Sequence, residues 1–368
     1  MSWSPQQDQA LSAVDAWLKD PHGPQVFYLA GFAGTGKTTL AKHLSEGVSG
    51  LVLFGAFTGK AALVLQRKGC IGASTIHSMI YKPKRRAGGL VEFVLDYDCA
   101  VRAASLVVID EVSMVDEKLG RDLLSFGVKV LVLGDPAQLP PVNGEGFFTA
   151  REPDIMLTEV HRQARDNPII RMSMDVREGR ELPFGTYGTS KIITMRDVDR
   201  AEVLNAEQIL VGLNKSRQLY NQRVRTLRGY SGVRPHVGER LVCLKNRANK
   251  GLLNGGLWTV LDHLDEEVAD HFEMILDPAD AGAVKQAVAV SVHTFFFQGR
   301  DKELHYTELR RTEQFDFGYA LTVHKSQGSQ WGDVYLFDES QAFRSDGRKH
   351  LYTAITRAAE RITIARAA

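Results

Sequence analysis

Residues 26–40 are VFYLAGFAGTGKTTL, a short apolar run that leads into a glycine-rich loop. The run at 26–30 predicts a buried strand, and a helix is expected from about Lys37. Between them, residues 31–38 match the pattern G-x-x-x-x-G-K-[ST] in full, in the strand, loop and helix context that a phosphate-binding loop requires. The stretch therefore predicts a P-loop that binds a nucleoside triphosphate.

The residue types in this loop suit phosphate and Mg²⁺. Glycines let backbone N–H groups surround the phosphates, and the N-terminus of the following helix adds positive potential. Lys37 is expected to contact the β- and γ-phosphates, and Thr38 to bind Mg²⁺. The residues predicted to hold the nucleotide here are Gly31, Ala33, Gly34, Thr35, Gly36, Lys37, Thr38 and Thr39.

Further apolar runs follow the loop at 51–56, 106–109 and 128–133. Continuous apolar runs are typical of parallel strands that are buried on both faces. Stretches of helical character separate the runs, and after Pro153 the alternation starts again, with a run at 209–213. This alternation predicts an α/β fold of the doubly wound kind.

Acidic residues follow the apolar run at 106–109 directly. Asp110 and Glu111 are therefore expected at the C-terminal end of a strand, the edge at which α/β sheets bind ligands. Asp110 is suited to hold Mg²⁺, and Glu111 to orient and deprotonate an attacking water. In the loop GDPAQ at 134–138, Gln138 is placed to sense the γ-phosphate or that water. Either feature alone is more often a solvated strand end or a turn, but the complete P-loop favours the catalytic interpretation.

Two stretches interrupt the alternation. Residues 82–98 contain a Gly-Gly turn signal and a β-prone run, which predict a small inserted hairpin. The hairpin carries a basic cluster, which by itself is more often a solvated surface than a binding site: Lys82, Lys84, Arg85 and Arg86. From residue 238 to about 315, short β-prone runs alternate with turns, which predicts an all-β insert that forms a small barrel.

Composition sets limits on the class of protein. The chain has 368 residues, of which 44% are apolar and 24% charged, a profile typical of globular proteins. No apolar run approaches the ~18 residues that span a bilayer, and the polar first ten residues lack a signal-peptide core, so a cytoplasmic location is expected. Three distant cysteines indicate neither a disulfide framework nor a zinc site. The formal net charge of +1 argues against a broad basic surface, so any nucleic-acid path must be a local groove.

The motifs of the chain, in their order, resemble those of a known family. They are GFAGTGKT (31–38), AFTGKAA (56–62), STIHS (74–78), IDEVSMV (109–115), GDPAQLPPV (134–142), EVHRQ (159–163), YALTVHKSQGSQW (319–331) and YTAITRA (352–358). This series resembles the RecD-like and Dda-like helicases of superfamily 1B and spans nearly the whole chain. HKSQG is especially characteristic of them.

The resemblance implies a domain scheme and an activity. It implies two RecA-like domains with ATP held between them, 5′-to-3′ movement on single-stranded DNA, and unwinding of the duplex ahead. It assigns the hairpin to a strand-separating pin and the β insert to an SH3-like barrel. The predicted domains are 1–81 with 99–152, the pin at 82–98, 153–231 with 316–368, and the barrel at 232–315.

The resemblance also implies roles for single residues around ATP. Gln7 matches a glutamine that reads the adenine edge. Arg162 and Arg357 match two arginines that reach the γ-phosphate from the second domain, where guanidinium groups stabilise the charge of the transferring phosphoryl group. Gly328 and Gln330 lie in a loop that matches one lining the same cleft.

Positions that match DNA-contacting positions of the family are Phe57, Thr58, Lys60, His77, Thr322, His324 and Ser326. Small hydroxyl and imidazole donors suit phosphate contacts that carry no sequence information. For each threonine, serine and histidine among them, a capping hydroxyl or a satisfied histidine is an equal alternative. Phe57 departs from the family, which usually has proline there: its ring could stack on a base or face the core. The predicted pin is also short for the family, which puts processive unwinding in doubt.

Three other functions stay open at this point. The chain could be a DNA-stimulated translocase that unwinds little, a P-loop kinase for a small molecule, or a non-catalytic DNA-binding subunit. The second α/β domain with its own arginines argues against the kinase, and the intact catalytic set argues against the subunit. The expected partners are single-stranded DNA and junctions of single and double strands, with replication or recombination proteins as further candidates, and the expected state is a monomer.

Overall fold

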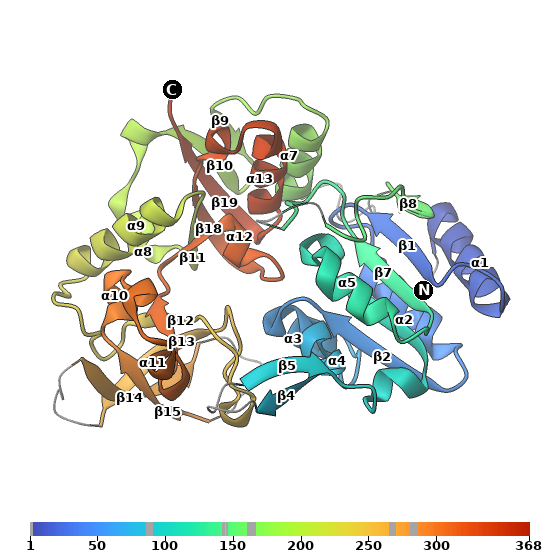
Figure 1. Cartoon of the computed structure of the whole chain (residues 1–368). Helices are drawn as coiled ribbons and strands as arrows, with labels where there is room; N and C mark the ends of the chain where they lie inside the picture. The colour runs from blue at the N-terminus through green and yellow to red at the C-terminus, as the bar shows by residue number, and fades with distance from the viewer. Residues whose placement is uncertain are drawn as a thin grey trace. The chain divides into compact units, whose positions relative to one another are not determined.

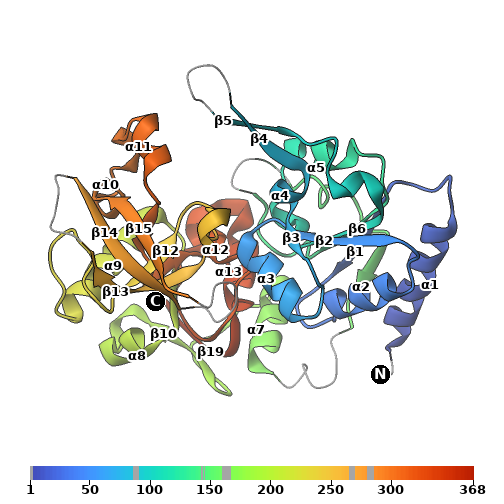
Figure 2. The same cartoon turned by 90° about the horizontal axis from the view of Figure 1, so that it is seen from below.

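The computed structural model describes residues 3–85, 91–141, 144, 146–159, 167–264, 270–279 and 286–368. The chain forms two compact units, Met1–Arg177 and Glu178–Ala368. Figures 1 and 2 show the first unit in blue to green and the second in yellow-green to red. Each unit contains a six-stranded sheet with helices packed on it.

The sheet of the first unit is entirely parallel, with the strand order β3-β2-β6-β7-β1-β8. Its strands are β1 (Val26–Gly31), β2 (Leu51–Ala56), β3 (Ser74–Thr75), β6 (Ala104–Asp110), β7 (Val130–Gly134) and β8 (Ile155–Leu157). The three apolar runs after the P-loop therefore form neighbouring buried strands, as predicted. The sequence prediction began the second α/β domain at residue 153, whereas β8 pairs with β1 in the first sheet. A strand of three residues leaves too short a pattern to show which sheet it joins.

Helices cover both faces of this sheet. They are α1 (Pro5–Lys19), α2 (Lys37–Glu46), α3 (Gly59–Arg67), α4 (Ile76–Ile80) and α5 (Glu117–Leu124); a further helix, α7 (Pro168–Arg177), ends the unit. Alternate residues of β1 belong to two separate apolar clusters: Phe27 and Leu29 pack with α1 and α2, whereas Tyr28 and Ala30 pack with α4 and α5. Because successive strand residues point to opposite faces, the sheet is buried on both sides, which confirms the doubly wound prediction.

Strands β4 (Tyr81–Arg85) and β5 (Val91–Leu95) form a two-stranded antiparallel hairpin after α4. Its register pairs Tyr81 with Leu95 and Lys84 with Glu92. The hairpin coincides with the predicted stretch 82–98 except that it begins one residue earlier, at Tyr81. Residues 86–90, which include Arg86 and the Gly-Gly turn, lie outside the described part of the chain.

The second unit has the strand order β17-β11-β18-β19-β10-β9, parallel except for the β9–β10 pair. Its strands are β9 (Gly185–Tyr187), β10 (Ser190–Thr194), β11 (Gln208–Val211), β17 (Ala320–Thr322), β18 (Trp331–Phe337) and β19 (Ala358–Arg366). Its helices are α8 (Arg200–Asn205), α9 (Asn214–Leu227), α12 (Val323–Ser326) and α13 (Gly347–Ile355). A second α/β sheet, to which the chain returns after the insert as predicted, is thus present.

An antiparallel sheet of order β15-β14-β13-β12-β16 is inserted between β11 and β17. Its strands are β12 (Arg240–Cys243), β13 (Leu257–His263), β14 (His271–Pro278), β15 (Val288–His293) and β16 (Phe315–Phe317), and two short helices, α10 (Phe295–Gln298) and α11 (Tyr306–Arg311), precede β16. One apolar cluster contains residues of both sheets, such as Ile209 and Phe272. The insert is therefore packed onto the α/β sheet through a shared core; its description as an SH3-like barrel stays a prediction.

Helix α9 holds the chain where it returns from the insert. The buried Arg217 donates to the Asp316 carboxylate at 2.5 Å. One turn later, the Asn221 side chain accepts from the Ala320 backbone N–H at 2.8 Å and donates to the Ala320 carbonyl at 3.1 Å. Residues four apart lie on the same helix face, so a polar stripe of α9 satisfies backbone groups of the returning strands that would otherwise be buried without partners.

The next residue on that stripe supports a stability prediction. Arg225 makes two hydrogen bonds to Glu239, at 2.8 and 2.9 Å, and the Glu239 side chain has no exposed surface. Arg225→Ala should lower the free energy of unfolding by about 3–5 kcal/mol, because it leaves a buried carboxylate without its counter-charge. Urea denaturation measures this. Arg223→Ala, on the exposed side of the same helix, is the control and should cost less than about 1 kcal/mol; equal costs would contradict the account.

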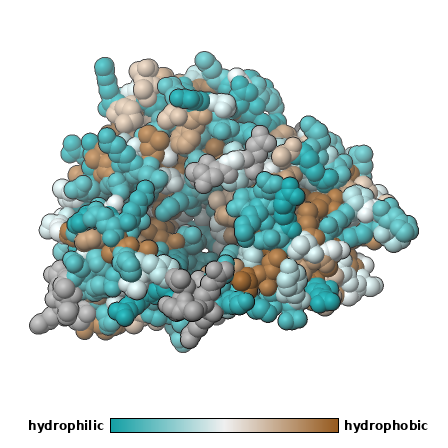
Figure 3. All heavy atoms as spheres, in the orientation of Figure 1, coloured by the Kyte–Doolittle hydropathy of each residue, from teal (hydrophilic) through white to brown (hydrophobic). Residues whose placement is uncertain are grey.

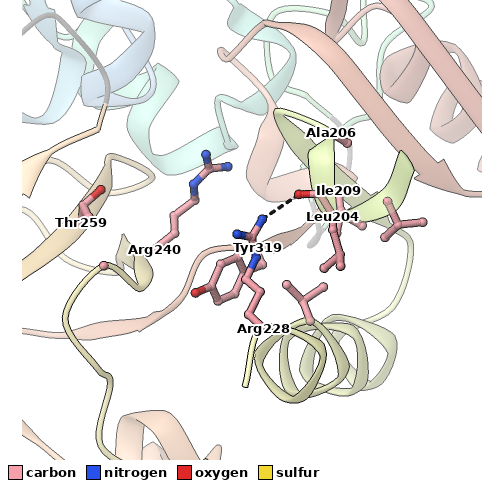
Figure 4. Close-up of a pocket in the computed structure, with 10 residues that line it drawn as sticks. Leu204, Ala206, Ile209, Arg228, Arg240, Thr259 and Tyr319 are labelled. Atoms are coloured by element: carbon pink, nitrogen blue, oxygen red, sulfur yellow. Dashed lines mark hydrogen bonds between the residues drawn. The ribbon is translucent and has the colours of Figure 1, made fainter. Parts of the chain in front are cut away.

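A cavity of about 150 Å³ lies where α8, α9 and the insert meet (Figure 4). The Arg228 guanidinium crosses one side of it and donates to the Leu204 carbonyl at 2.6 Å, above the ring of Tyr319. Because Leu204 belongs to α8 and Arg228 is the C-cap of α9, the arginine connects the two helices.

The surface is largely polar on the face shown in Figure 3, with apolar side chains in small separate groups. None of the helices in the described ranges has both the length and the apolar character needed to cross a membrane.

Candidate nucleotide-binding site

The P-loop has the backbone that its glycines predict. β1 ends at Gly31 and α2 begins at Lys37, and Gly34 and Gly36 both have φ of +79°, a region that favours glycine. A Cβ atom on Gly31 would lie 2.7 Å from Thr35 Oγ1 and 2.9 Å from Leu157 Cβ. Side chains at these three positions would therefore strain or displace the loop.

Hydrogen bonds within the loop fix its shape. Phe32 is their centre: its carbonyl accepts from Thr35 Oγ1 at 2.9 Å and from the Lys37 ammonium at 3.0 Å. Lys37 also donates to the Gly31 carbonyl at 2.5 Å, and the Phe32 N–H donates to the Leu157 carbonyl at 3.3 Å. The Thr35 side chain is buried, whereas Gly34 and Thr39 are exposed. The ammonium thus lies over its own loop, at the N-terminus of α2.

The end of β6 brings the predicted magnesium ligands together. Thr38 Oγ1 donates to Asp110 Oδ2 at 2.8 Å, although 72 positions separate the two residues in the chain. Parallel strands present their carboxyl ends at one edge of the sheet, and β6 lies two strands from β1 in that sheet. A hydroxyl and a carboxylate are hard oxygen ligands of the kind that Mg²⁺ prefers. The residues present therefore fit a Mg²⁺ ion.

Glu111 follows directly and has an unusual backbone. Its φ of +56° and ψ of +45° place a non-glycine residue in the left-handed region. Its N–H donates to Asp110 Oδ1 at 2.8 Å, which leaves Oδ2 to face Thr38. Such conformations are uncommon and concentrate at functional sites, where the surrounding structure holds them. The motif pattern predicted the carboxylate but not this strained backbone.

Gln138 is buried beside the end of β7. The Asp135 side chain accepts from the Ala137 N–H at 3.0 Å, and the Asp135 carbonyl accepts from the Gln138 N–H at 3.1 Å, so a tight turn positions the amide. Gln138 Oε1 is buried and finds no hydrogen-bond partner within the described ranges. An unsatisfied buried acceptor costs about 1–3 kcal/mol, and a functional partner explains why such a group is kept.

Tyr28 is a polar residue of this edge that sequence reasoning missed. Its hydroxyl lies 3.1 Å from the position that a Cβ on Gly134 would take. Burial and the nearby Asp135 carboxylate raise the pKa of Tyr28 above its usual range, so the phenol is neutral. Because Tyr28 stands inside the apolar run of β1, the sequence indicated only a core residue there.

Gln7 lies against the P-loop from α1. Its Nε2 donates to the Thr35 carbonyl at 3.1 Å, and its Oε1 accepts from the Ser4 N–H at 3.0 Å. The second contact belongs to a capping box, in which Ser4 Oγ accepts in return from the Gln7 N–H. Gln7 therefore ties the start of α1 to the loop, and its predicted contact with adenine stays a prediction.

The predicted DNA residues of this unit lie on α3, α4 and the strand end before α3. Phe57 is half-buried and packs on the apolar cluster that contains Tyr28. Thr58 caps α3, because its Oγ1 accepts from the Ala61 N–H at 3.1 Å. Lys60 is half-buried in the first turn of that helix. Core packing is thus part of the role of Phe57, and capping of α3 is part of the role of Thr58.

His77 is exposed on α4 and belongs to a group of rings. Its centroid lies 4.6 Å from that of Tyr81 and 4.7 Å from that of Phe93, on the hairpin. Partial desolvation and the Lys118 ammonium lower the pKa of His77, so its imidazole is neutral at pH 7. The residue can thus offer a hydrogen bond or a stacking face, but no positive charge, to a phosphate backbone.

The candidates of the second unit lie around α12. Thr322 and Ser326 have 5% and 0% of their surface exposed. Both hydroxyls are engaged: Thr322 Oγ1 accepts from the Lys325 N–H at 3.3 Å, and Ser326 Oγ donates to the Val323 carbonyl at 2.7 Å. Both hydroxyls therefore stabilise the turn around α12. This is the capping role that the sequence analysis gave as the alternative to a direct DNA contact. His324 lies between them, and burial lowers the pKa of its imidazole.

The loop after α12 carries the remaining predicted cleft residues. Gly328 has φ of +74°, and Gln330 Nε2 donates to the Ala358 carbonyl at 3.4 Å. Arg357 is 5% exposed and donates to the carbonyls of Thr353 and Ser329 at 3.1 and 3.2 Å. A guanidinium held by neutral acceptors keeps its charge available to an anion. Arg162 lies outside the described residues.

The fold and the site together define a class. A P-loop between β1 and α2, with a threonine and an aspartate in contact and a strained glutamate beside them, is the site of a P-loop nucleoside triphosphatase.

Comparison with known proteins gives the family. Residues 4–197, more than half of the chain, match the AAA domain family, and residues 317–365 match the UvrD-like helicase C-terminal domain. The chain therefore belongs to the AAA domain family, and its matches are consistent with the RecD-like and Dda-like helicases of superfamily 1B.

Two relatives and one structure illustrate this kinship. The ATP-dependent RecD2 DNA helicase of Deinococcus radiodurans is 30% identical over 92% of this chain, which spans 46% of that protein. The ATP-dependent DNA helicase dda of Enterobacteria phage T4 is 36% identical over 41% of the chain and 37% of its own length. Pif1 from Bacteroides, solved bound to single-stranded DNA, has the same fold, with a TM-score of 0.59 and 17% identity over 99% of this chain and 92% of that one. The chain thus spans less than half the length of these two curated relatives.

Proposed function

We propose that this chain is a Mg²⁺-dependent ATP hydrolase that moves 5′ to 3′ along single-stranded DNA and unwinds the duplex ahead. The observation that carries the proposal is the contact between Thr38 and Asp110 at 2.8 Å, next to Lys37, at the ligand-binding edge of a parallel sheet. Kinship to the RecD2 and dda helicases supports DNA as the track.

In this proposal the residues of the first unit bind and activate ATP. The N–H groups of the P-loop and the N-terminus of α2 hold the phosphates, and Lys37 exchanges its contacts with loop carbonyls for phosphate oxygens. Thr38 and Asp110 hold Mg²⁺, which supplies charge neutralisation at the phosphates. Glu111 orients the attacking water and accepts its proton. Gln138 senses that water, from which its buried Oε1 can accept a hydrogen bond, or the γ-phosphate, to which its Nε2 can donate.

The second unit contributes positive charge to the transferring phosphoryl group. Arg357 and Arg162 are proposed to reach the γ-phosphate when the domains close, so that hydrolysis depends on closure. Gly328 and Gln330 line the same cleft in this scheme, and Gln7 reads the adenine. The domains follow the sequence prediction, with residues 153–177 moved to the first because β8 pairs with β1 and the first compact unit extends to Arg177.

DNA is proposed to run along the predicted contact residues of both units, with the β4–β5 hairpin as the strand-separating pin and the antiparallel insert as an SH3-like barrel. His77, packed on Phe93 of the hairpin, links the DNA path to the pin. The near-zero net charge fits a path built on neutral donors and stacking rather than on a basic surface. The proposed setting is a cytoplasmic monomer that serves replication or recombination.

Phe57 supplies a prediction about this path. Phe57→Ala should weaken binding of single-stranded DNA about 5- to 150-fold, because stacking of a base on an aromatic ring is worth ~1–3 kcal/mol. Fluorescence anisotropy with a labelled oligothymidylate measures the affinity. Phe57→Leu, which keeps apolar packing on the core cluster but removes the ring, should lose the same affinity. Wild-type affinity in a folded Phe57→Leu variant would assign the ring to the core alone.

Phosphate release in the presence and absence of single-stranded DNA tests the proposed function. We expect ATP hydrolysis that requires Mg²⁺ and rises at least about tenfold with DNA. Hydrolysis indifferent to DNA would favour a small-molecule kinase with adventitious hydrolysis, and DNA binding without any hydrolysis would favour a non-catalytic subunit. A separate unwinding assay then distinguishes the helicase from the translocase that the short hairpin suggests, which would show DNA-stimulated hydrolysis without unwinding.

A further inference from the structure

An arginine outside every motif of the chain lies on the P-loop. The guanidinium carbon of Arg177 is 3.6 Å from the ring centroid of Phe32, the second residue of the loop. That distance is a close cation–π contact, and the planar guanidinium of arginine can lie flat on the ring. Arg177 is half-buried, so the contact is partly shielded from water.

Phe32 links this cation–π contact to the catalytic lysine, Lys37. Its carbonyl accepts from both Lys37 and Thr35, and its N–H is held by Leu157 of β8. A displacement of the ring would move the carbonyl that positions the ammonium. The position of Arg177 is thereby connected to the position of Lys37.

Arg177 also stands where the chain passes from one unit to the other. It is the last residue of α7 and of the first unit, and Glu178 begins the second. Gly179, in the turn that follows, has φ of +77°, which permits a sharp change of direction. Ile169, Met172 and Val176 are buried along α7, so the helix is held along its apolar face and its last residue lies next to the turn of the chain.

We propose that Arg177 is a positioning residue that couples the P-loop to the connection between the units through its contact with Phe32. The inference rests on the proposed function, because stimulation of ATP hydrolysis by DNA requires that movement of one unit changes the geometry of the nucleotide site. When the connection changes direction, Arg177 shifts on the Phe32 ring and the Phe32 carbonyl shifts with it. Lys37 is then released from, or returned to, its loop contacts.

The test is ATP hydrolysis of Arg177→Ala with and without single-stranded DNA. We expect the DNA-stimulated rate to fall about tenfold while the DNA-free rate stays within about twofold of wild type. Phe32→Leu should lose the same stimulation, and the double variant should be no worse than either single one, because both remove one interaction. Arg177→Lys, which keeps the charge without the planar stack, should recover part of the stimulation. Arg171→Ala, an exposed arginine of the same helix, is the matched control and should behave as wild type.

A purely structural role would lower the melting temperature without changing the ratio of the two rates. An unchanged ratio in folded Arg177→Ala, or effects of the two single variants that multiply in the double variant, would overturn the coupling. If Arg177→Ala fails to fold, Phe32→Leu and Arg177→Lys decide in the same way. If DNA does not stimulate ATP hydrolysis by the wild-type protein, the proposed function and this inference are overturned together. If DNA stimulates the wild-type protein and Arg177→Ala equally, the inference alone is overturned.

Discussion

Lys37→Ala is expected to lower the rate of ATP hydrolysis by at least about 100-fold. The ammonium is the cation that the P-loop contributes at the N-terminus of α2, and its present partners are the Gly31 and Phe32 carbonyls of the same loop. Alanine cannot replace a charge that stabilises the β- and γ-phosphates in the transition state. Phosphate release under saturating ATP and single-stranded DNA measures the effect, because saturation separates turnover from binding.

The matched control is Lys42→Ala, which removes a lysine from the same helix five residues further along. It should retain hydrolysis within about twofold, and both variants should melt near the wild-type temperature. Substantial turnover by Lys37→Ala would mean that the loop residues carry no catalytic charge, and the assignment of the nucleotide site would have to be abandoned.

Glu111→Gln is expected to bind ATP with wild-type affinity and to hydrolyse it about 10²- to 10⁴-fold more slowly. The amide keeps the shape of the side chain and can keep the strained backbone, with φ of +56°, but it cannot accept a proton from water. Binding of a fluorescent ATP analogue, followed by single-turnover hydrolysis, separates the two properties. The variant should therefore accumulate in the ATP-bound state.

Glu117→Gln serves as the control for the charge change. Glu117 lies in the first turn of α5 and pairs with Arg121 at 2.7 Å on an exposed surface, so its substitution should leave hydrolysis unchanged. Rates of wild-type magnitude for Glu111→Gln would show that another group acts as the base. Loss of ATP affinity would instead show that Glu111 holds the site together.

Local patterns in the sequence predicted the first sheet and the nucleotide edge because their signals are local. The P-loop is one continuous stretch, and Asp110 and Glu111 follow an apolar strand directly, so parallel packing alone brings them to Thr38. The β insert was recognisable for the same reason: its short runs and turns have the period of strands.

Contacts between distant segments left no such signal. β8 has three residues, and only its pairing with β1 shows that it belongs to the first sheet. The buried hydroxyls of Thr322 and Ser326, and the neutral acceptors around Arg357, depend on how α12 and α13 pack on their sheet. Arg177 stands in no motif, so its contact with Phe32 could be found only in three dimensions.

The central claim is that ATP hydrolysis drives this chain along single-stranded DNA in one direction. Its most direct test is the unwinding of two duplexes, one with a 5′ single-stranded tail and one with a 3′ tail, with hydrolysis followed in parallel. The account predicts unwinding of the 5′-tailed duplex alone, dependent on ATP and Mg²⁺ and abolished in Lys37→Ala. Unwinding of the 3′-tailed duplex alone, or of neither duplex with hydrolysis that ignores DNA, would contradict it.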